Sequence, residues 1–186
     1  MVSIYYEVEK KRRILMYSKE ELAELIIKNP GEYNSYKKSV EELDLTELDF
    51  SNITLEEIDF SNTELAGTSF TDAHLSNCNF TSADLNAADF TRANIVECDF
   101  SEAILNGTDY SYATVNYCNF TDADMAGCIV KEADLTDSDF SASNNLAATR
   151  ADETTIWPDN DLLPDDFDTN YNKEDSEEEE SAEIEY

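Results

Sequence analysis

The chain has 186 residues, an apolar share of 41% and a formal net charge of −31, carried by 43 acidic and 12 basic side chains. A surface this acidic repels phosphate, so we expect no direct contact with nucleic acid or with anionic membranes. No apolar run reaches the roughly 20 residues of a membrane span, and residues 1–17 lack the continuous apolar stretch of a signal peptide, which predicts a cytoplasmic protein.

The charge is distributed unevenly and divides the chain into parts. Residues 1–40 carry a net charge of +2, residues 41–150 carry −19 and residues 151–186 carry −14. We interpret residues 1–40 as an N-terminal cap segment, 41–156 as a repeat domain and 157–170 as a C-terminal capping segment. Residues 171–186 are acidic and contain no regularly spaced apolar residues, which predicts a disordered tail.

The first clear element is a helix near residues 19–29. Ser18 and Glu21 have the spacing of a capping box, and the apolar residues after them lie on one helical face. Pro30 should end this helix, because proline disrupts a helix interior. A further short turn of helix is expected over residues 33–38, just before the repeat.

The repeat places one large apolar residue at every fifth position from residue 45 to residue 140, a period that neither a helix nor a flat strand explains. Two residues before each of these centres, from Thr63 onward, stands a second series that contains only Ala, Thr, Cys or Ser. Alternating small and large residues at a fixed offset indicate a narrow, filled interior. The Leu and Phe centres should therefore form the core.

The consecutive units Ala83–Ala87 and Ala88–Arg92 resemble the pentapeptide-repeat family, whose consensus is A(D/N)LXX. This resemblance covers about 100 residues, and it implies an all-β solenoid, a right-handed quadrilateral β-helix with four pentapeptides in each square coil. Residues 32–38 also resemble the lead-in of bacterial members. Residues 155–159 and 166–168 resemble their terminator.

With 20 residues in each coil, every twentieth side chain should lie above the previous one, at a spacing of about 4.8 Å. One column of the expected core would then contain Phe60, Phe80, Phe100, Phe120 and Phe140. The opposite column would contain Phe50, Phe70, Phe90, Tyr110 and Val130. About five coils would give a rod roughly 25 Å long, with a small α-helical N-terminal cap.

Both ends of the repeat depart from the pattern. In the first coil, large residues replace small ones at Leu43, Leu48, Ile53 and Ile58, which predicts a wide coil on which the N-terminal helix can pack. At the other end, Leu146 and Ile156 resume the five-residue spacing one position late. This predicts a one-residue insertion near Ser143 and places both residues inward. Trp157, Leu162, Leu163 and Phe167 should fold over the end.

The cysteines and the histidine offer little chemistry. Cys78, Cys98 and Cys118 would share one inward column at a spacing that permits one disulfide, but a buried site in a reducing compartment favours simple packing. A zinc site would lack a fourth ligand, because Cys128 falls on the opposite side. His74 is outward and isolated. We therefore predict no catalytic, cofactor or metal site and no enzyme activity.

The outward carboxylates form rows, and the candidate partner-binding surface comprises Asp84, Asp89, Asp99, Glu102, Asp109, Asp122, Asp124 and Asp139. One interpretation is structural, since such groups satisfy turns and keep a rod soluble. The other is a docking surface for a basic partner. A divalent-cation site is a third option, although ladders of Asp lack the clustered oxygen shell that calcium requires.

Two functions remain open. The first is a non-catalytic protein-interaction module, in which a rigid acidic rod presents rows of polar side chains to an unidentified protein partner with a basic surface. The second follows from the resemblance, since some members, the Qnr and MfpA groups, are thought to mimic duplex DNA and bind DNA gyrase, a type II topoisomerase. Capping at both ends predicts a monomer.

Overall fold

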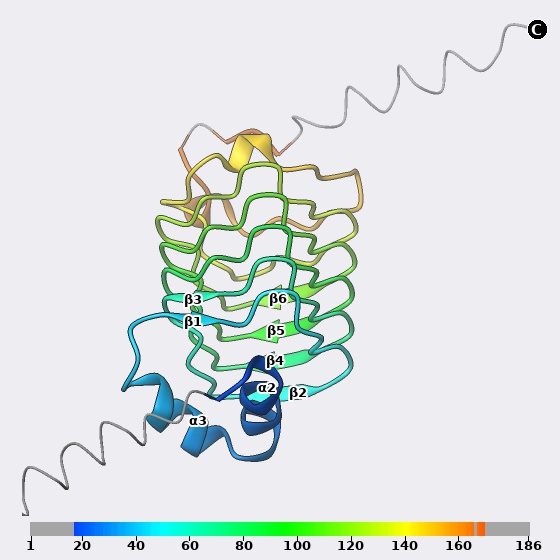
Figure 1. Ribbon diagram of the computed structural model, residues 1–186. Helices are drawn as coiled ribbons and strands as arrows, with labels where there is room; N and C mark the ends of the chain where they lie inside the picture. The colour runs from blue at the N-terminus through cyan, green and yellow to red at the C-terminus, as the bar shows by residue number, and fades with distance from the viewer. Residues whose placement is uncertain (1–16, 166, 170–186) are drawn as a thin grey trace, which may run out of the picture.

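The computed structural model describes residues 17–165 and 167–169 as a stack of square coils with two helices at one end (Figure 1). Each coil is built from short extended segments separated by turns, and the coils follow one another along a single axis. The acidic tail predicted over residues 171–186 lies outside the described residues. No helix in the described part is long and apolar enough to cross a membrane.

The coils pair in parallel with a register of 20 residues. Strands β2, β4, β5 and β6 form one four-stranded sheet, and β1 pairs with β3. Isolated bridges continue the same register on the remaining faces, as in Asp59 with Asn79 and Asp49 with Ser69. The strands are β1 Leu43–Asp44, β2 Thr54–Glu56, β3 Thr63–Glu64, β4 His74–Ser76, β5 Asn94–Val96 and β6 Thr114–Asn116.

The corners of the square depend on a left-handed residue. At every repeat from Glu47 to Asp137, the second residue after the centre has a φ between +50° and +70°. Gly107 occupies one of these positions, where the absence of a Cβ removes the steric cost. At many corners the turn is closed by a hydrogen bond, such as the one from the amide of Ala73 to the carbonyl of Phe70 at 3.0 Å.

The centres fill the interior as two aromatic columns and two aliphatic ones. Phe80 and Phe100 stack with ring centroids 4.8 Å apart and planes 1° from parallel, and Phe70 and Phe90 stack at 4.7 Å. Rings of the two columns meet edge to face, as Phe80 and Phe90 do at 6.2 Å. These geometries are favourable for aromatic pairs. The stack predicted from the 20-residue spacing is thus present from Phe60 to Phe140.

Most of the inward polar atoms have partners. The hydroxyl of Thr108 donates to the carbonyl of Leu85, and the hydroxyl of Ser138 donates to that of Val115, both at 2.8 Å. Two buried hydroxyls have no hydrogen-bond partner among the described residues, that of Tyr33 in the N-terminal cap and that of Tyr110 in the interior of the coils. The ring of Tyr110 continues the column of Phe90 at 4.9 Å, so the residue is held by packing alone.

Two helices cover the first coil. Helix α2, Lys19–Lys28, has the predicted capping box of Ser18 and Glu21, and helix α3 is Pro30–Lys37. The second helix begins earlier than expected over residues 33–38, because Asn29 ends α2 and at the same time caps α3. Proline is well suited to the first position of a helix, where its missing N–H costs nothing.

The helices extend the ladders of the coil with side chains. The amide of Asn34 donates to the carbonyl of Glu57 at 2.8 Å, and its side-chain oxygen accepts from the backbone N–H of Asp59 at 3.0 Å. The side-chain amide of Asn34 therefore makes the two hydrogen bonds that a peptide group of a further coil would make. Next to it, the buried ring of Tyr33 lies 6.0 Å from that of Phe60 and continues the phenylalanine column.

At the C-terminal end the register slips twice. Asn144 still pairs with Asp124 at a spacing of 20, whereas Arg150 pairs with Ile129 and Ile156 pairs with Asp134. The first inserted residue therefore lies just after Asn144, as the predicted insertion near Ser143 required, and a second one, which was not predicted, follows Arg150. Leu146 is buried as predicted.

The prediction that Ile156 points inward is wrong. Its side chain is 53% exposed, because the second insertion moves it into line with the outward Asp134. Trp157 takes the inward place instead. Its ring lies 6.5 Å from Phe140 and 4.8 Å from Phe167, and Leu163 is buried beside this cluster.

Candidate functional site

The aspartates of the outward rows cap their own turns. The carboxylate of Asp99 accepts from the backbone N–H of Ser101 at 2.9 Å, and Asp139 accepts from both the N–H and the hydroxyl of Ser141. Asp89 accepts from the N–H of Thr91 at 2.8 Å. An aspartate or asparagine in this place stabilises a turn by accepting from the backbone two residues on. The A(D/N)LXX pattern thus has a local structural cause.

The same contacts limit what these groups offer to a partner. Asp84, Asp109 and Asp124 are half-buried and accept from the backbone N–H of the residue two positions later at 3.0, 2.8 and 3.3 Å. The side-chain amide of Asn145 also donates to Asp124 at 2.7 Å. One oxygen of each carboxylate is therefore engaged within the coil, which supports the structural interpretation of these rows.

Glu102 and Asp122 differ, because they lie at corners and are exposed. Glu102 accepts from the hydroxyl of Ser82, one coil earlier, at 2.8 Å. Both carboxylates belong to the same face as Asp99 and Asp139, and within the row the amide of Asn119 donates to Asp99 at 3.2 Å. This amide relieves repulsion between neighbouring carboxylates.

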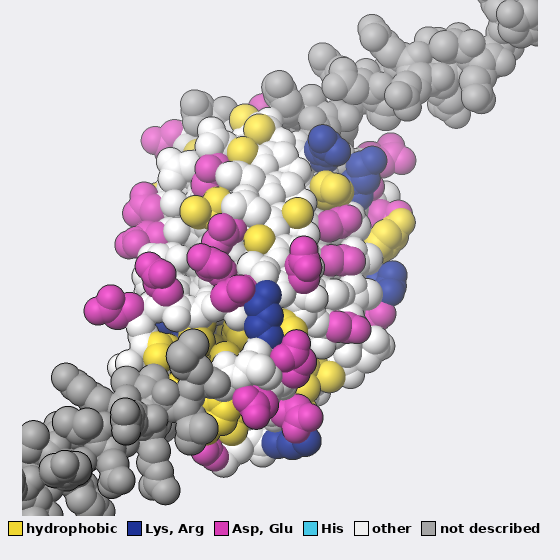
Figure 2. All heavy atoms as spheres, viewed as in Figure 1, with side chains coloured by type: hydrophobic (Ala, Val, Ile, Leu, Met, Phe, Trp, Pro, Cys, Tyr) yellow, Lys and Arg dark blue, Asp and Glu magenta, His cyan; other side chains and the backbone are white. Residues whose placement is uncertain are grey.

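The eight predicted surface residues do not form one patch. Asp99, Glu102, Asp122 and Asp139 share the face behind the Phe60 to Phe140 column, which we call the Phe100 face. The remaining four belong to two other faces, with Asp84 aligned to Asp124 through Ile104, and Asp89 aligned to Asp109. Acidic side chains are spread over the face shown in Figure 2, among only a few basic ones.

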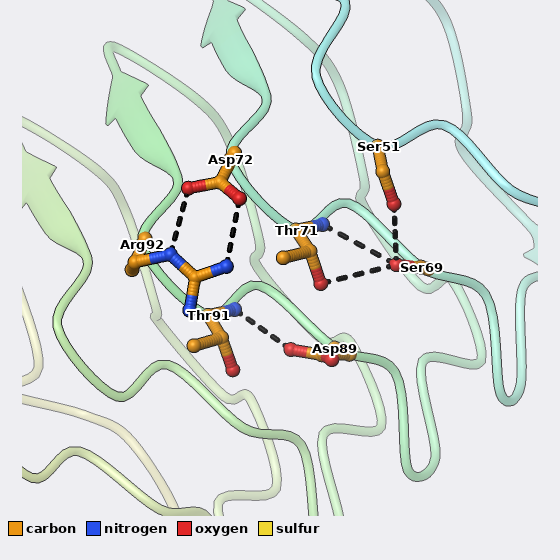
Figure 3. A network of polar contacts seen from close by, with 7 residues as sticks. All are labelled: Ser51, Ser69, Thr71, Asp72, Asp89, Thr91 and Arg92. Atoms are coloured by element: carbon orange, nitrogen blue, oxygen red, sulfur yellow. Dashed lines mark hydrogen bonds and ion pairs between the residues drawn. The ribbon is translucent and has the colours of Figure 1, made fainter.

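One ion pair links two coils. The guanidinium of Arg92 donates to both oxygens of Asp72 at 2.8 and 2.7 Å, and the pair lies beside the turn that Asp89 caps (Figure 3). This contact lowers the pKa of Asp72 and raises that of Arg92. It was not predicted from the sequence, although a spacing of 20 residues between opposite charges on one corner column would have revealed it.

The cysteine thiols lie in the packed interior. Cys78, Cys98, Cys118 and Cys128 are all buried and free. The pKa of Cys98 is raised to about 12, first by its contact with Cys118, and burial raises that of Cys128 to about 12. Thiolate character is the source of cysteine reactivity, so these groups serve as packing. Within the described residues, no three His, Cys, Asp or Glu side chains are grouped so that they could hold a metal ion.

Comparisons with known sequences give a consistent result. The family model described as the pentapeptide repeat region matches residues 39–110, and the model for pentapeptide repeats in eight copies matches residues 108–141. Among curated proteins there is no match.

Several solved structures are similar. The pentapeptide repeat protein Rfr23 from the cyanobacterium Cyanothece 51142 is 21% identical, with a TM-score of 0.42, over 67% of this chain and 97% of that one. A pentapeptide repeat protein from the Arabidopsis thaliana thylakoid lumen is 33% identical over 64% and 70%, with a TM-score of 0.28. QnrB1, a plasmid-mediated fluoroquinolone resistance protein, is 18% identical over 77% and 98%, with a TM-score of 0.20.

The square coil, its 20-residue register and the matched models lead to the same assignment. The chain belongs to the pentapeptide-repeat family.

Proposed function

We propose that this protein is a non-catalytic protein-interaction module: a cytoplasmic, monomeric rod of about five coils, capped by its N-terminal helices, that binds a partner with a basic surface. The observation that carries the proposal is the Phe100 face. There a rigid ladder holds Asp99, Glu102, Asp122 and Asp139 in fixed rows, and the pair at the corners is exposed. Fixed charges of one sign steer and orient a partner of the opposite sign.

The interior supports the same conclusion. The centres and the small residues of the middle coils are buried by packing against their equivalents one coil away, as Leu85, Phe90 and Ala93 are. These side chains are occupied by the fold. Recognition therefore falls to outward groups, which are mostly carboxylates, amides and hydroxyls.

The test is a matched pair of charge variants. The partner is first captured from the source cytosol with the full chain. Binding should then weaken about tenfold when Asp99, Glu102, Asp122 and Asp139 become Asn or Gln, since exposed charge pairs contribute roughly 0.2–1 kcal/mol each. Asn preserves the turn caps, as Asn79 and Asn119 already do in the same row.

The control changes the same number of charges elsewhere. Glu41, Glu42, Glu47 and Glu64 are exposed near the N-terminal end of the solenoid, and their replacement by Gln should leave binding nearly unchanged. Equal losses in both variants would show that only the overall charge matters. An unaffected Phe100-face variant would contradict the choice of this face.

The second candidate function is mimicry of duplex DNA at a type II topoisomerase. It is favoured by the net charge of −31 and by the family relationship to proteins such as QnrB1, a fluoroquinolone resistance protein. If it is correct, micromolar protein should alter supercoiling by DNA gyrase at low salt, and added salt should abolish the effect. No change at low salt would eliminate this function.

A further inference from the structure

Two tyrosines stand out on the surface of the solenoid. Tyr112 is 55% exposed and lies in the turn before β6, whereas Tyr117 is 62% exposed and lies at the bend after it. They therefore flank one strand on one face of the square. Between them, the outward side chains of β6 are Thr114 and Asn116, both half-buried.

Neither ring is placed there by packing. Both residues have a left-handed backbone, with φ of 62° and 56°, a conformation that is costly for a bulky side chain. The other corner positions with positive φ hold Gly, Ala, Ser, Asn, Asp, Glu or Arg, so these two are the only aromatic residues among them. Exposed rings at strained positions add little to stability, which favours a role in recognition.

Each tyrosine lies near a carboxylate one coil further along. Glu132 raises the pKa of Tyr112, and Asp137 raises that of Tyr117. Glu97 also lies near Tyr117 and contributes to this electrostatic effect. Each exposed ring thus has negative charge beside it.

Two basic residues lie near Tyr112, namely Arg92 and Lys131, and the carbonyl of Lys131 accepts from the backbone N–H of Tyr112 at 2.9 Å. Arg92, one coil below Tyr112, is already paired with Asp72 through two hydrogen bonds. Asp152 lies beyond Glu132, and its carboxylate accepts from the backbone N–H of that residue at 3.2 Å. The face that carries β6 therefore combines two exposed aromatic rings with more carboxylates than basic groups, since Glu97, Glu132, Asp137 and Asp152 outnumber Arg92 and Lys131.

We propose that the β6 face is the docking surface for an extended, arginine- or lysine-rich segment of a partner protein. This inference rests on the proposed function and adds a second surface to it, because the β6 face meets the Phe100 face at the corner that carries Tyr117. Guanidinium and ammonium groups bind over tyrosine faces and pair with adjacent carboxylates. Tyrosine is also enriched where protein surfaces bind partners, because it offers a large rigid area with a polar end.

The test uses a defined probe, a fluorescein-labelled dodecapeptide of alternating arginine and serine, with the full chain at low salt. Replacing Tyr112 and Tyr117 together by Ser should weaken binding about tenfold, as measured by fluorescence anisotropy. Ile104→Ser is the matched control, because Ile104 is 41% exposed on another face. A peptide with glutamine in place of arginine should not bind.

A second measurement does not depend on the variants. On titration of the wild-type protein, the amide resonances of Thr114 and Asn116 should shift more than those of Ser101 and Thr121 on the Phe100 face. Shifts centred on the Phe100 face, or binding unchanged in the double variant, would overturn this inference and leave the proposed function intact. Failure of the peptide to bind at all would also overturn it, whereas the proposed function is decided separately by the captured partner and the charge variants.

Discussion

The two ends of the solenoid are closed by different structural elements. A stack of coils exposes unpaired backbone groups and an open aromatic column at each end. At the N-terminal end, α3 supplies side chains, with Asn34 bonding the backbone of the first coil and Tyr33 continuing the stack. At the C-terminal end the chain itself continues, and the carbonyl of Leu162 accepts from the N–H of Phe140 at 2.8 Å.

This difference indicates where each end is vulnerable. The N-terminal closure depends on side chains of two short helices, whereas the C-terminal closure combines backbone bonds with the cluster around Trp157. In a solenoid each coil contacts mainly its neighbours, so loss of one closure should loosen that end first. The following changes test the comparison, from the largest expected effect to the smallest.

Tyr33→Ala should be the most damaging change. Removing a fully buried aromatic ring costs about 3–5 kcal/mol of unfolding free energy, and here it also uncovers Phe60. Native-state hydrogen exchange should show faster exchange at the amide of Leu45, with little change at that of Phe100. Tyr36→Ala, at a half-buried ring, is the control. Equally faster hydrogen exchange at amides along the whole chain would show that the two ends do not open independently.

Trp157→Ala should cost less, about 2 kcal/mol, because its side chain is only half-buried against Phe140 and Phe167. Chemical denaturation monitored by circular dichroism would measure this change. Ile156→Ala is the matched control and should change stability by less than about 0.5 kcal/mol, since Ile156 is exposed. A larger loss of stability in Ile156→Ala than in Trp157→Ala would support the register predicted from the sequence, in which Ile156 points inward.

Asn34→Ala should cost about 1–3 kcal/mol, because it leaves the carbonyl of Glu57 and the N–H of Asp59 without this partner. Asn34→Asp keeps the acceptor and loses the donor, so its effect should be intermediate. Urea denaturation of the three proteins measures the order. Equal stability of all three would mean that water replaces the amide at this end.

Tyr110→Phe tests the middle of the rod, where no end effect operates. Removal of its unpartnered buried hydroxyl should stabilise the protein by about 1 kcal/mol in thermal and urea unfolding. Tyr112→Phe removes the hydroxyl of an exposed ring and should have little effect. A destabilised Tyr110→Phe variant would reveal a hydrogen-bond partner inside the column.

The smallest effect concerns acid. Hydrogen bonds from Lys19 and Thr46 lower the pKa of Asp44 to about 2. A lowered folded-state pKa adds stability above the unfolded value of about 3.9, and this stability is lost as the pH falls toward 2. The stability advantage of the wild type over Asp44→Asn should therefore be present at about pH 5 and vanish near pH 2. A stability difference that stays constant across this pH range would contradict the pairing of Asp44 with Lys19.

Much of the fold could be predicted from residue spacing, because inward positions depend on a short local period. The stack of Phe60 to Phe140 and the burial of Cys78, Cys98 and Cys118 followed from it. The C-terminal register could not be predicted in this way. Inserted residues change which side chains point inward, and the apolar character of the side chains does not reveal the change. Ile156 and Trp157 are adjacent and both apolar, and only the bridge to Asp134 distinguishes them.

The candidate site was less accessible to prediction. The aspartates were found as rows, but their engagement in turn caps depends on rotamers and hydrogen bonds that spacing does not specify. The role of Asn34 was also hidden, because its partners are 23 and 25 residues away along the chain. Tyr112 and Tyr117 became noticeable only when their exposure and backbone conformation were known.

The sequence alone determined the family, the coil period and the interior of this protein, because a five-residue pattern repeated without interruption leaves one way to bury its large residues. The tertiary structure decided how the ends are closed, which carboxylates are engaged in turns and which aromatic side chains are exposed. These features depend on contacts between neighbouring coils, and residues 20 or more positions apart meet only after the chain has closed each square.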